Sequence, residues 1–508
     1  SFFLLSPILI IFFQGIYSIN NIDNLYAPMY ILGSSKLIFL VSVVVLLISI
    51  PLAWVNTMTN FWGRKFIQIF CILPLGVPAF ISAYTYAEIL EPGGYLSIYL
   101  SNFYGFSIRN TLFASIILGL SLFPYVYLLT RIAIINFSAR FIEAAKTMGK
   151  TPWQCFFKIC IPMALPGIAA GLALALMETI NDFGVADFFG LQTLTIGVFQ
   201  YISTINDLPS AFSLSLIILI IMIFLYVFEQ KMRGGRKFNN SSYESIRWSR
   251  YQLNRSKTIL VFILSFLPIF FGFFIPLIFN FFIFITNFQI IDYSNFLSSL
   301  YNSIILGGFV GFFCVLVSIF INFYSRFSRS KKFLYYKKII NMGYALPGVV
   351  IALGVLIFLK YVNHFLQFTI LATFIGLVLA LIIRLISISN NSIDSGLDKI
   401  GKSIDDASRL MGRRSSTTYF RVIIPQIRLS VLAGFLLVFV DTIKELPITL
   451  LLRPFNFNTL ATSLYEYSSN EMFENGSLHA LTIILFLSLV IYFFDSVIEK
   501  KQNSKILK

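Results

Sequence analysis

The sequence is short of charge, histidine and cysteine. Only 12% of its 508 residues are charged and 57% are hydrophobic, whereas an average soluble protein has about 25% charged residues. Its two histidines and four scattered cysteines form neither a disulfide framework nor the spacing of a metal site. These shortages exclude soluble, disordered and disulfide-rich secreted proteins, and they leave a polytopic membrane protein.

Long apolar runs fill the chain instead. A membrane-spanning helix needs roughly 20 mostly apolar residues. The first run lacks a basic segment and a small-residue cleavage site, so we interpret it as a span rather than a signal peptide. The predicted fold class is an all-α polytopic membrane protein with about 12 transmembrane helices, at 2–18, 35–56, 66–88, 111–130, 163–183, 210–230, 258–287, 301–323, 339–360, 367–389, 427–446 and 478–497.

Lysine and arginine gather on alternate loops. Six loops on one side of the predicted membrane hold 31 of the 38 basic residues, whereas the opposite loops 184–209 and 288–300 hold none. Cytoplasmic loops are enriched in Lys and Arg, so both termini are predicted to be cytoplasmic. The net charge of +16 is then a signature of orientation in a lipid bilayer, and no nucleic-acid partner is expected.

The two halves of the chain repeat each other. Glu143–Gly149 aligns with Asp406–Gly412 at an offset of 263, and the same offset aligns Glu178–Asp182 with Asp441–Glu445. Matching loops fall on the same side of the membrane, which indicates two parallel six-helix repeats. The predicted domains are a first half at 1–230 with its core at about 35–230, a basic cytoplasmic linker at 231–257, and a second half at 258–508 with its core at about 298–497.

Each half has one long basic loop between its fourth and fifth spans. In both loops a short helix leads to a glycine that ends or bends it, and a proline starts the next span at a tolerated first-turn position. A short amphipathic helix on a membrane surface is a good docking element for a partner's groove. The residues at matching spacing are Glu143, Ala144, Ala145, Gly149, Ile159 and Pro162 in the first loop, and Asp406, Ala407, Gly412, Val422 and Pro425 in the second.

This spacing resembles the EAA loop of ABC-importer permeases. The first loop departs from that pattern at Ile161, and the second departs further, with Asp406 and Ser408. The resemblance implies the type I importer permease fold and a bacterial inner-membrane subunit. It also implies that both loops insert into an ABC ATPase present in two copies, and that a periplasmic binding protein delivers the substrate.

One motif suggests nucleotide binding and is rejected. Gly396–Ser403 fits the phosphate-loop pattern, but that motif needs a buried strand before it within an α/β domain. The segment before it is polar, and the whole loop has no room for such a domain. We therefore expect no cofactor in this chain, no catalytic residues and no enzymatic activity, with ATP used by the separate ATPase.

Two pairs of carboxylates lie inside predicted spans, and each pair shares one helix face. They could line a translocation path as a hard-oxygen surface suited to a cation. Alternatively, they pair locally with Lys444 or Arg453 and hold the two halves together. Both interpretations stay open, and no metal ligands are assigned; the residues are Glu178, Asp182, Asp441 and Glu445. Arg131 and Arg384 are expected to be anchors at the cytoplasmic ends of spans.

The stretch Lys444–Pro454, followed by Thr459–Ala461, resembles fused iron(III) importer permeases, as does the stretch Met177–Gly184 in the first half. This resemblance implies iron(III) as the substrate. Thiamine or another small cation or organic ion is the alternative cargo. A 12-helix secondary transporter is a different class, which the two matching loops disfavour. A polytopic membrane enzyme is disfavoured because no catalytic cluster is found.

Overall fold

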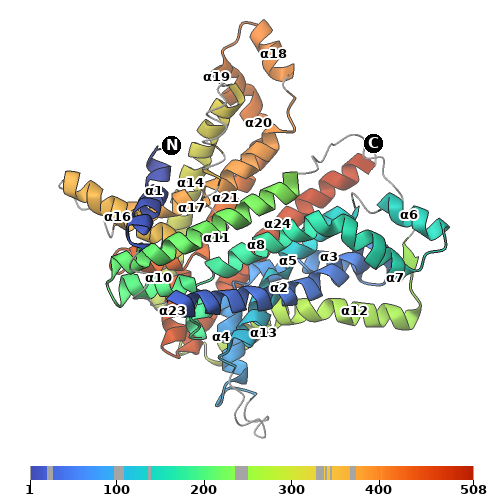
Figure 1. Cartoon of the computed structure of the whole chain (residues 1–508), viewed down its shortest axis with the longest axis horizontal. Helices are drawn as coiled ribbons and strands as arrows, with labels where there is room; N and C mark the ends of the chain where they lie inside the picture. Colours follow the sequence, from blue (N-terminus) through green and yellow to red (C-terminus); the bar gives the residue numbers. More distant parts are fainter. Residues whose placement is uncertain are drawn as a thin grey trace. The chain divides into compact units, whose positions relative to one another are not determined.

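The computed structural model describes residues 2–19, 27–96, 108–135, 139–234, 250–327, 337, 340–341, 343, 346–366, 373–401 and 403–506. Within these ranges the chain is helical except for loops and one two-residue parallel strand pair, β1 (Thr59–Asn60) with β2 (Tyr251–Gln252). The predicted all-α fold class is confirmed (Figure 1). Much of the predicted linker 231–257 and of the basic segment 324–338 lies outside the described residues.

The chain forms two compact units, and each unit draws on both halves of the sequence. Unit 1 comprises residues 1–25, 197–219 and 291–470, and unit 2 comprises residues 26–196, 220–290 and 471–508. The helices α10 (Leu194–Ser203) and α11 (Leu208–Gly234) contribute residues to both. The units are defined by packing and the predicted halves by sequence repetition, so the domain boundaries stay a prediction.

Unit 1 has a core of three mutually packed helices, α14, α17 and α21, while α1 packs on α16. Its elements are α1 (Phe2–Tyr17), α14 (Tyr293–Phe327), α16 (Gly348–Leu366), α17 (Phe374–Leu397), α18 (Ser403–Leu410), α19 (Ser415–Thr418), the π-helical turn η7 (Tyr419–Ile423), α20 (Ile424–Gln426), α21 (Arg428–Ile443), α22 (Pro447–Leu452) and α23 (Leu460–Ser469).

Unit 2 has the corresponding core of α2, α5 and α8, and α24 packs on η2 and α13. Its elements are α2 (Ala27–Met58), β1, α3 (Arg64–Phe70), the 3₁₀ turn η2 (Leu73–Gly76), α4 (Ala79–Leu90), α5 (Thr111–Ala133), α6 (Ala139–Thr147), α7 (Pro152–Cys155), the π-helical turn η4 (Phe156–Cys160), α8 (Ile161–Asn181), α9 (Gly184–Phe188), β2, α12 (Arg255–Ile269), the π-helical turn η5 (Phe270–Phe274), α13 (Ile275–Thr286) and α24 (Phe473–Ile506).

The same hydrogen bond recurs in each core. The hydroxyl of Ser34 on α2 accepts from the backbone N–H of Leu194 at 2.8 Å, and the hydroxyl of Ser303 on α14 accepts from that of Leu460 at 2.8 Å. Ser34 and Ser303 are 269 residues apart, so the first helix of each core follows a slightly longer offset than the loops do. The structure thus repeats the duplication seen in the sequence.

Small residues let the core helices approach closely. A Cβ atom added to Gly171 on α8 would lie 2.7 Å from the Cα of Val126 on α5. At the matching position of the second core, a Cβ on Gly434 would lie 3.2 Å from the hydroxyl of Ser389. Helices in lipid gain little from apolar burial against one another, so close backbone contact of this kind is a main source of their association.

The structure has eight helices long and apolar enough to cross a membrane, or ten if each of two bent pairs is one span, within the described residues. The expected number of about twelve is therefore not confirmed. The two expected spans outside this set are 2–18 and 339–360, where the structure has the shorter apolar helices α1 (Phe2–Tyr17) and α16 (Gly348–Leu366).

Prolines explain part of the difference. The expected span 339–360 runs across Pro347, and α16 begins only after it, at Gly348. The expected span 66–88 crosses Pro78, where the chain bends by 90° between η2 and α4. The residue before a proline avoids the helical region, so the apolar run 66–88 becomes two helical pieces.

We expect Gly171→Ala to lower the free energy of unfolding by about 1–3 kcal/mol, because the new methyl group meets backbone atoms that have no room to move. Gly308→Ala is the matched control, since a Cβ at Gly308 on α14 has nothing within 4 Å. Thermal unfolding of the purified chain in detergent measures both. Equal melting temperatures for the two variants would contradict the close packing of α5 on α8.

Candidate functional site

The first of the two repeated loops, loop 1 (residues 139–162), belongs to unit 2. Its helix α6 ends where Gly149 takes the left-handed conformation, with φ 74°. The N–H of Gly149 donates to the carbonyl of Lys146, and that of Lys150 donates to the carbonyl of Ala145, both at 3.0 Å. This is a glycine-terminated helix end of the Schellman type.

Loop 2 (residues 403–425) belongs to unit 1 and ends its helix α18 in the same way. Gly412 has φ 69°, its N–H donates to Arg409 at 2.9 Å, and the N–H of Arg413 donates to Ser408 at 3.1 Å. Figure 1 shows α18 beyond the ends of the long helices of its unit. Both predicted glycines therefore end their helices, as the spacing indicated.

The two loops stay alike after the glycine. Each continues into one short helical turn, then a π-helical turn at 156–160 or 419–423, and then a helix with proline at its second residue, Pro162 or Pro425. π-Helical turns are rare and often mark functional sites. The likeness extends over the whole loop and not only over the residues of the motif.

Both loops expose large apolar side chains beside the glycine, next to basic ones. Met148 in loop 1 and Met411 in loop 2 are 77% and 72% exposed, and Leu410 is 90% exposed. The exposed basic neighbours are Lys150 in loop 1 and Arg409, Arg413 and Arg414 in loop 2. Of the predicted residues, Ala145 is buried, Glu143 and Ile159 are half-buried, and the exposed ones are Ala144, Gly149, Pro162, Asp406, Ala407, Gly412, Val422 and Pro425.

Two buried polar contacts hold loop 2, and the sequence analysis missed both. Asp405, next to the predicted Asp406, pairs with Arg326 at the end of α14 at 2.8 Å, with both side chains 9% exposed. The hydroxyls of Ser408 and Thr418 lie 2.5 Å apart. An acid beside the motif and a basic residue at the end of α14, the first long helix of this core, were the available signals.

Ser408, which departs from the family pattern, is compensated within its own loop. In loop 1 the matching positions are Ala145 and Cys155, both buried. In loop 2 both positions carry hydroxyls, which satisfy each other. A buried hydroxyl without a partner is costly, so the two departures form one coordinated exchange.

The intramembrane carboxylates occupy equivalent positions where helices break. Asp182 follows α8, and its Oδ1 accepts from the N–H of Val185 at 2.8 Å. Glu445 follows α21, and its Oε1 accepts from the N–H of Ile448 at 3.1 Å. Each carboxylate thus satisfies a free N–H at the start of a short helix, α9 or α22, which is the usual role of an N-terminal cap.

In unit 1 the carboxylates are also paired with cations. Glu445 forms a buried ion pair with Arg384 at 2.5 Å, and Asp441 pairs with Lys444 at 2.6 Å. The expectation that Arg384 anchors the cytoplasmic end of a span is wrong, because α17 continues to Leu397 and Arg384 is 8% exposed in its middle. Arg453, the other suggested partner, pairs with Glu466 instead.

Unit 2 has a different set of residues at the same place. The positions that match Gly348, Arg384 and Glu445 are Ala79, Ser121 and Asp182. The described residues place no Lys or Arg in an ion pair with Asp182, and the buried hydroxyl of Ser121 has no hydrogen-bond partner among them. The half-buried Glu178 lies one turn before Asp182 on α8.

Gly348 makes room for the ion pair. A Cβ at Gly348 would lie 2.5 Å from Nη1 of Arg384 and 2.7 Å from Oε1 of Glu445. In unit 2, where the arginine is replaced by Ser121, the glycine is replaced by Ala79. The glycine and the arginine therefore occur together.

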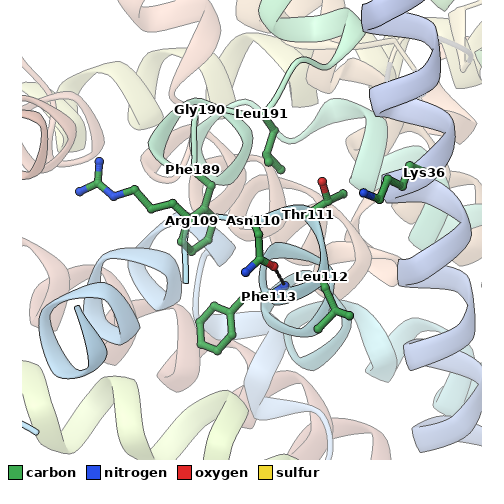
Figure 2. Close-up of a pocket in the computed structure, with 9 residues that line it drawn as sticks. All are labelled: Lys36, Arg109, Asn110, Thr111, Leu112, Phe113, Phe189, Gly190 and Leu191. Carbon is green, nitrogen blue, oxygen red and sulfur yellow. Dashed lines mark hydrogen bonds between the residues drawn. The ribbon is translucent and has the colours of Figure 1, made fainter. Parts of the chain in front are cut away.

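A pocket of about 550 Å³ lies at the start of α5 in unit 2 (Figure 2). Asn110 caps the helix by accepting from the N–H of Phe113 at 2.9 Å. Arg109 forms a two-bond ion pair with Glu91, and this hydrogen bonding raises the pKa of Arg109. The lining was not predicted from the sequence; it is formed by Lys36, Arg109, Asn110, Thr111, Leu112, Phe113, Phe189, Gly190 and Leu191.

No group of three or more His, Cys, Asp or Glu residues is placed to hold a metal ion in the part of the chain that the structure describes. The predicted carboxylates are thus not brought together as a metal site. Asp441 and Glu445 lie in unit 1, whereas Glu178 and Asp182 lie in unit 2. What these units show is a duplicated helical membrane protein with one surface loop and one carboxylate-capped break in each repeat.

Residues 45–234 and again 314–504 match one protein family, the binding-protein-dependent transport system inner membrane component. The chain belongs to this family. It is therefore a multi-pass inner-membrane permease subunit of an ABC importer and not an enzyme, and the family works with an ATPase and a periplasmic binding protein.

Three relatives show the range of the likeness. The Fe(3+)-transport system permease protein FbpB 2 of Haemophilus influenzae is 25% identical over 482 residues, covering 93% of this chain and 91% of the relative. The ferric transport system permease protein FbpB of Actinobacillus pleuropneumoniae is 22% identical, covering 85% and 65%. The molybdenum transport system permease protein ModB of Haemophilus influenzae is 30% identical, covering 32% and 76%.

We expect Gly348→Ala to lower the free energy of unfolding by about 1–3 kcal/mol, because the methyl group enters the space of a packed ion pair. The cost should shrink when Arg384→Met is already present, since the clash with Nη1 is then removed. A double-mutant cycle on melting temperatures measures this coupling.

Ala79→Gly is the matched control in unit 2, and we expect only the cost of about 1 kcal/mol or less of a glycine in a helix. If Gly348→Ala were as costly in the Arg384→Met variant as in the wild-type chain, the glycine would not be there for the ion pair.

Proposed function

We propose that this chain imports iron(III), delivered by a periplasmic binding protein and driven by two copies of an ABC ATPase. The observation that carries the proposal is the matched pair of loops, with the same glycine-ended helix, π-helical turn and proline in both repeats. Two equivalent docking elements in one chain suit two copies of one ATPase. The orientation with both termini in the cytoplasm would place both loops on the ATPase side.

The iron assignment is supported by the share of this chain that aligns with the ferric relatives. Both ferric relatives align along most of this chain, through both halves, whereas the molybdenum relative covers only 32% of it. The Lys444–Pro454 stretch that resembles iron permeases contains Glu445, which the structure places in the buried ion pair. Thiamine or another small cation or organic ion is the alternative cargo.

Transport would proceed by movement of the loops. When ATP closes the two ATPase subunits, α6 and α18 would be carried along, and each loop would pull on the core helix that follows it, α8 or α21. The buried ion pair from Arg326 on α14 to Asp405 ties loop 2 to the core of unit 1, and the contact from Ser408 to Thr418 joins the two parts of the loop on either side of Gly412. This chain would bind no nucleotide; Lys402 of the phosphate-loop-like segment lies outside the described residues.

The test is reconstitution of the chain with its ATPase and binding protein in proteoliposomes, following uptake of radiolabelled iron(III). Uptake should require both ATP and the binding protein. Gly149→Val with Gly412→Val should abolish it, because a β-branched residue is strained at positive φ and the helix ends would be rebuilt.

Gly93→Val is the matched control. Gly93 also has positive φ, at 95°, and open space around its Cβ, but it lies in a loop predicted to be on the opposite membrane face. Uptake should survive that change. ATP-dependent coupling without iron uptake would reject iron and make thiamine the next cargo to label. Uptake driven by an ion gradient without ATPase would overturn the importer proposal.

A further inference from the structure

Residues 250–252, near the end of the inter-half linker, are attached to the rest of unit 2. Tyr251 and Gln252 pair as a parallel strand with Thr59 and Asn60, which follow α2. The side-chain amides of Asn60 and Gln252 hydrogen-bond at 3.2 Å, and Nε of Arg250 donates to the carbonyl of Thr57 at 3.3 Å. The end of the linker is therefore tied to the chain by both backbone and side chains.

Tyr251 carries this attachment into loop 1. Nζ of Lys146, on α6, lies 4.0 Å from the centroid of the Tyr251 ring. The Tyr251 hydroxyl is buried beside the thiol of Cys155, on α7. The ring of Trp54, near the end of α2, lies with its centroid 6.4 Å away. One side chain thus contacts both helices of loop 1 and the core helix behind them.

Loop 1 lacks the anchor that loop 2 has. Loop 2 is held by the buried pair of Asp405 with Arg326, the latter at the end of α14. The matching residues in the first repeat are Ile142 and Thr57, which cannot form an ion pair. At this place Arg250 instead binds the Thr57 carbonyl, and Tyr251 receives Lys146 from α6.

We propose that Tyr251 is a positioning residue of the ATPase-coupling machinery: the end of the linker holds α6 in place as α14 holds α18 in the other repeat. The inference rests on the proposed function in so far as α6 docks on an ATPase. A cation held on an aromatic face is attracted to it, and here this contact fixes Lys146 in the last turn of the nine-residue helix α6.

The experiment uses the full chain assembled with its ATPase in proteoliposomes, and it measures ATP hydrolysis, substrate uptake and melting temperature together. Tyr251→Ala should lower uptake at least tenfold and raise the ATP hydrolysed per substrate moved. Tyr251→Phe should keep both near wild type, because the ring face remains. Lys146→Met should reproduce the Tyr251→Ala effect, and combining the two should add nothing further.

Tyr361→Ala, which removes an exposed tyrosine from α16 in unit 1, is the control. It should change neither the uptake nor the ATP hydrolysed per substrate moved. Normal coupling in Tyr251→Ala would overturn the proposal. If that variant does not fold, Lys146→Met decides, since its loss on an exposed loop leaves the core intact: normal coupling there overturns the proposal, and loss of coupling supports it.

Failure of the proposed function gives a different result. A wrong cargo leaves wild-type iron uptake absent, but the assembled complex still hydrolyses ATP, and a rate of hydrolysis that differs between Tyr251→Ala and the wild-type chain still tests Tyr251. A wild-type chain that binds no ATPase would overturn the importer proposal, and the role of Tyr251 with it.

Discussion

A backbone in hydrocarbon must satisfy its own hydrogen bonds, and the functional features of this chain lie where that requirement is hardest to meet. A helix meets it along its length but leaves free N–H groups wherever it restarts. The two repeats restart a helix at equivalent places, and in each a carboxylate accepts the exposed N–H, Asp182 for α9 and Glu445 for α22. The carboxylates that suggest a cation path in the sequence therefore have a structural role first.

Residues that differ between the two repeats differ together with the residues that they contact. Where one residue of a buried contact has changed, its neighbour has changed as well: Ser408 occurs with Thr418, and Gly348 with Arg384. The counterparts in the other repeat, Ala145 with Cys155 and Ala79 with Ser121, are uncharged in both pairs. The exchanges involve contacting residues, so one fold accommodates two chemically different versions of the same element.

The sequence was sufficient for features that depend on local pattern. Apolar runs located the core helices, and the glycine and proline spacing located both loops with their helix ends. The sequence was not sufficient where a residue's role depended on a contact with a distant residue or on the position where a helix ends. Arg384 was assigned to a helix end because the apolar run stops near residue 389, whereas α17 continues through a polar stretch to Leu397. The ion pair with Glu445 joins residues 61 positions apart, and no periodicity reports such a contact.

The contact of Tyr251 with loop 1 has a consequence for how such a chain could be divided or rejoined. A tether that only limits distance can be lengthened at little cost, because loop-closure entropy grows slowly with length. Here the final residues of the tether are also part of a folded surface, through β2 and the Lys146 contact. A break before Arg250 would leave a piece of the first half's surface on the other fragment, whereas a break after Gln252 would keep β2, β1 and Lys146 in one fragment. The last residues of the linker thus belong to the folded surface of the first half, and a position after Gln252 is the natural place to separate the two halves that a fused permease combines.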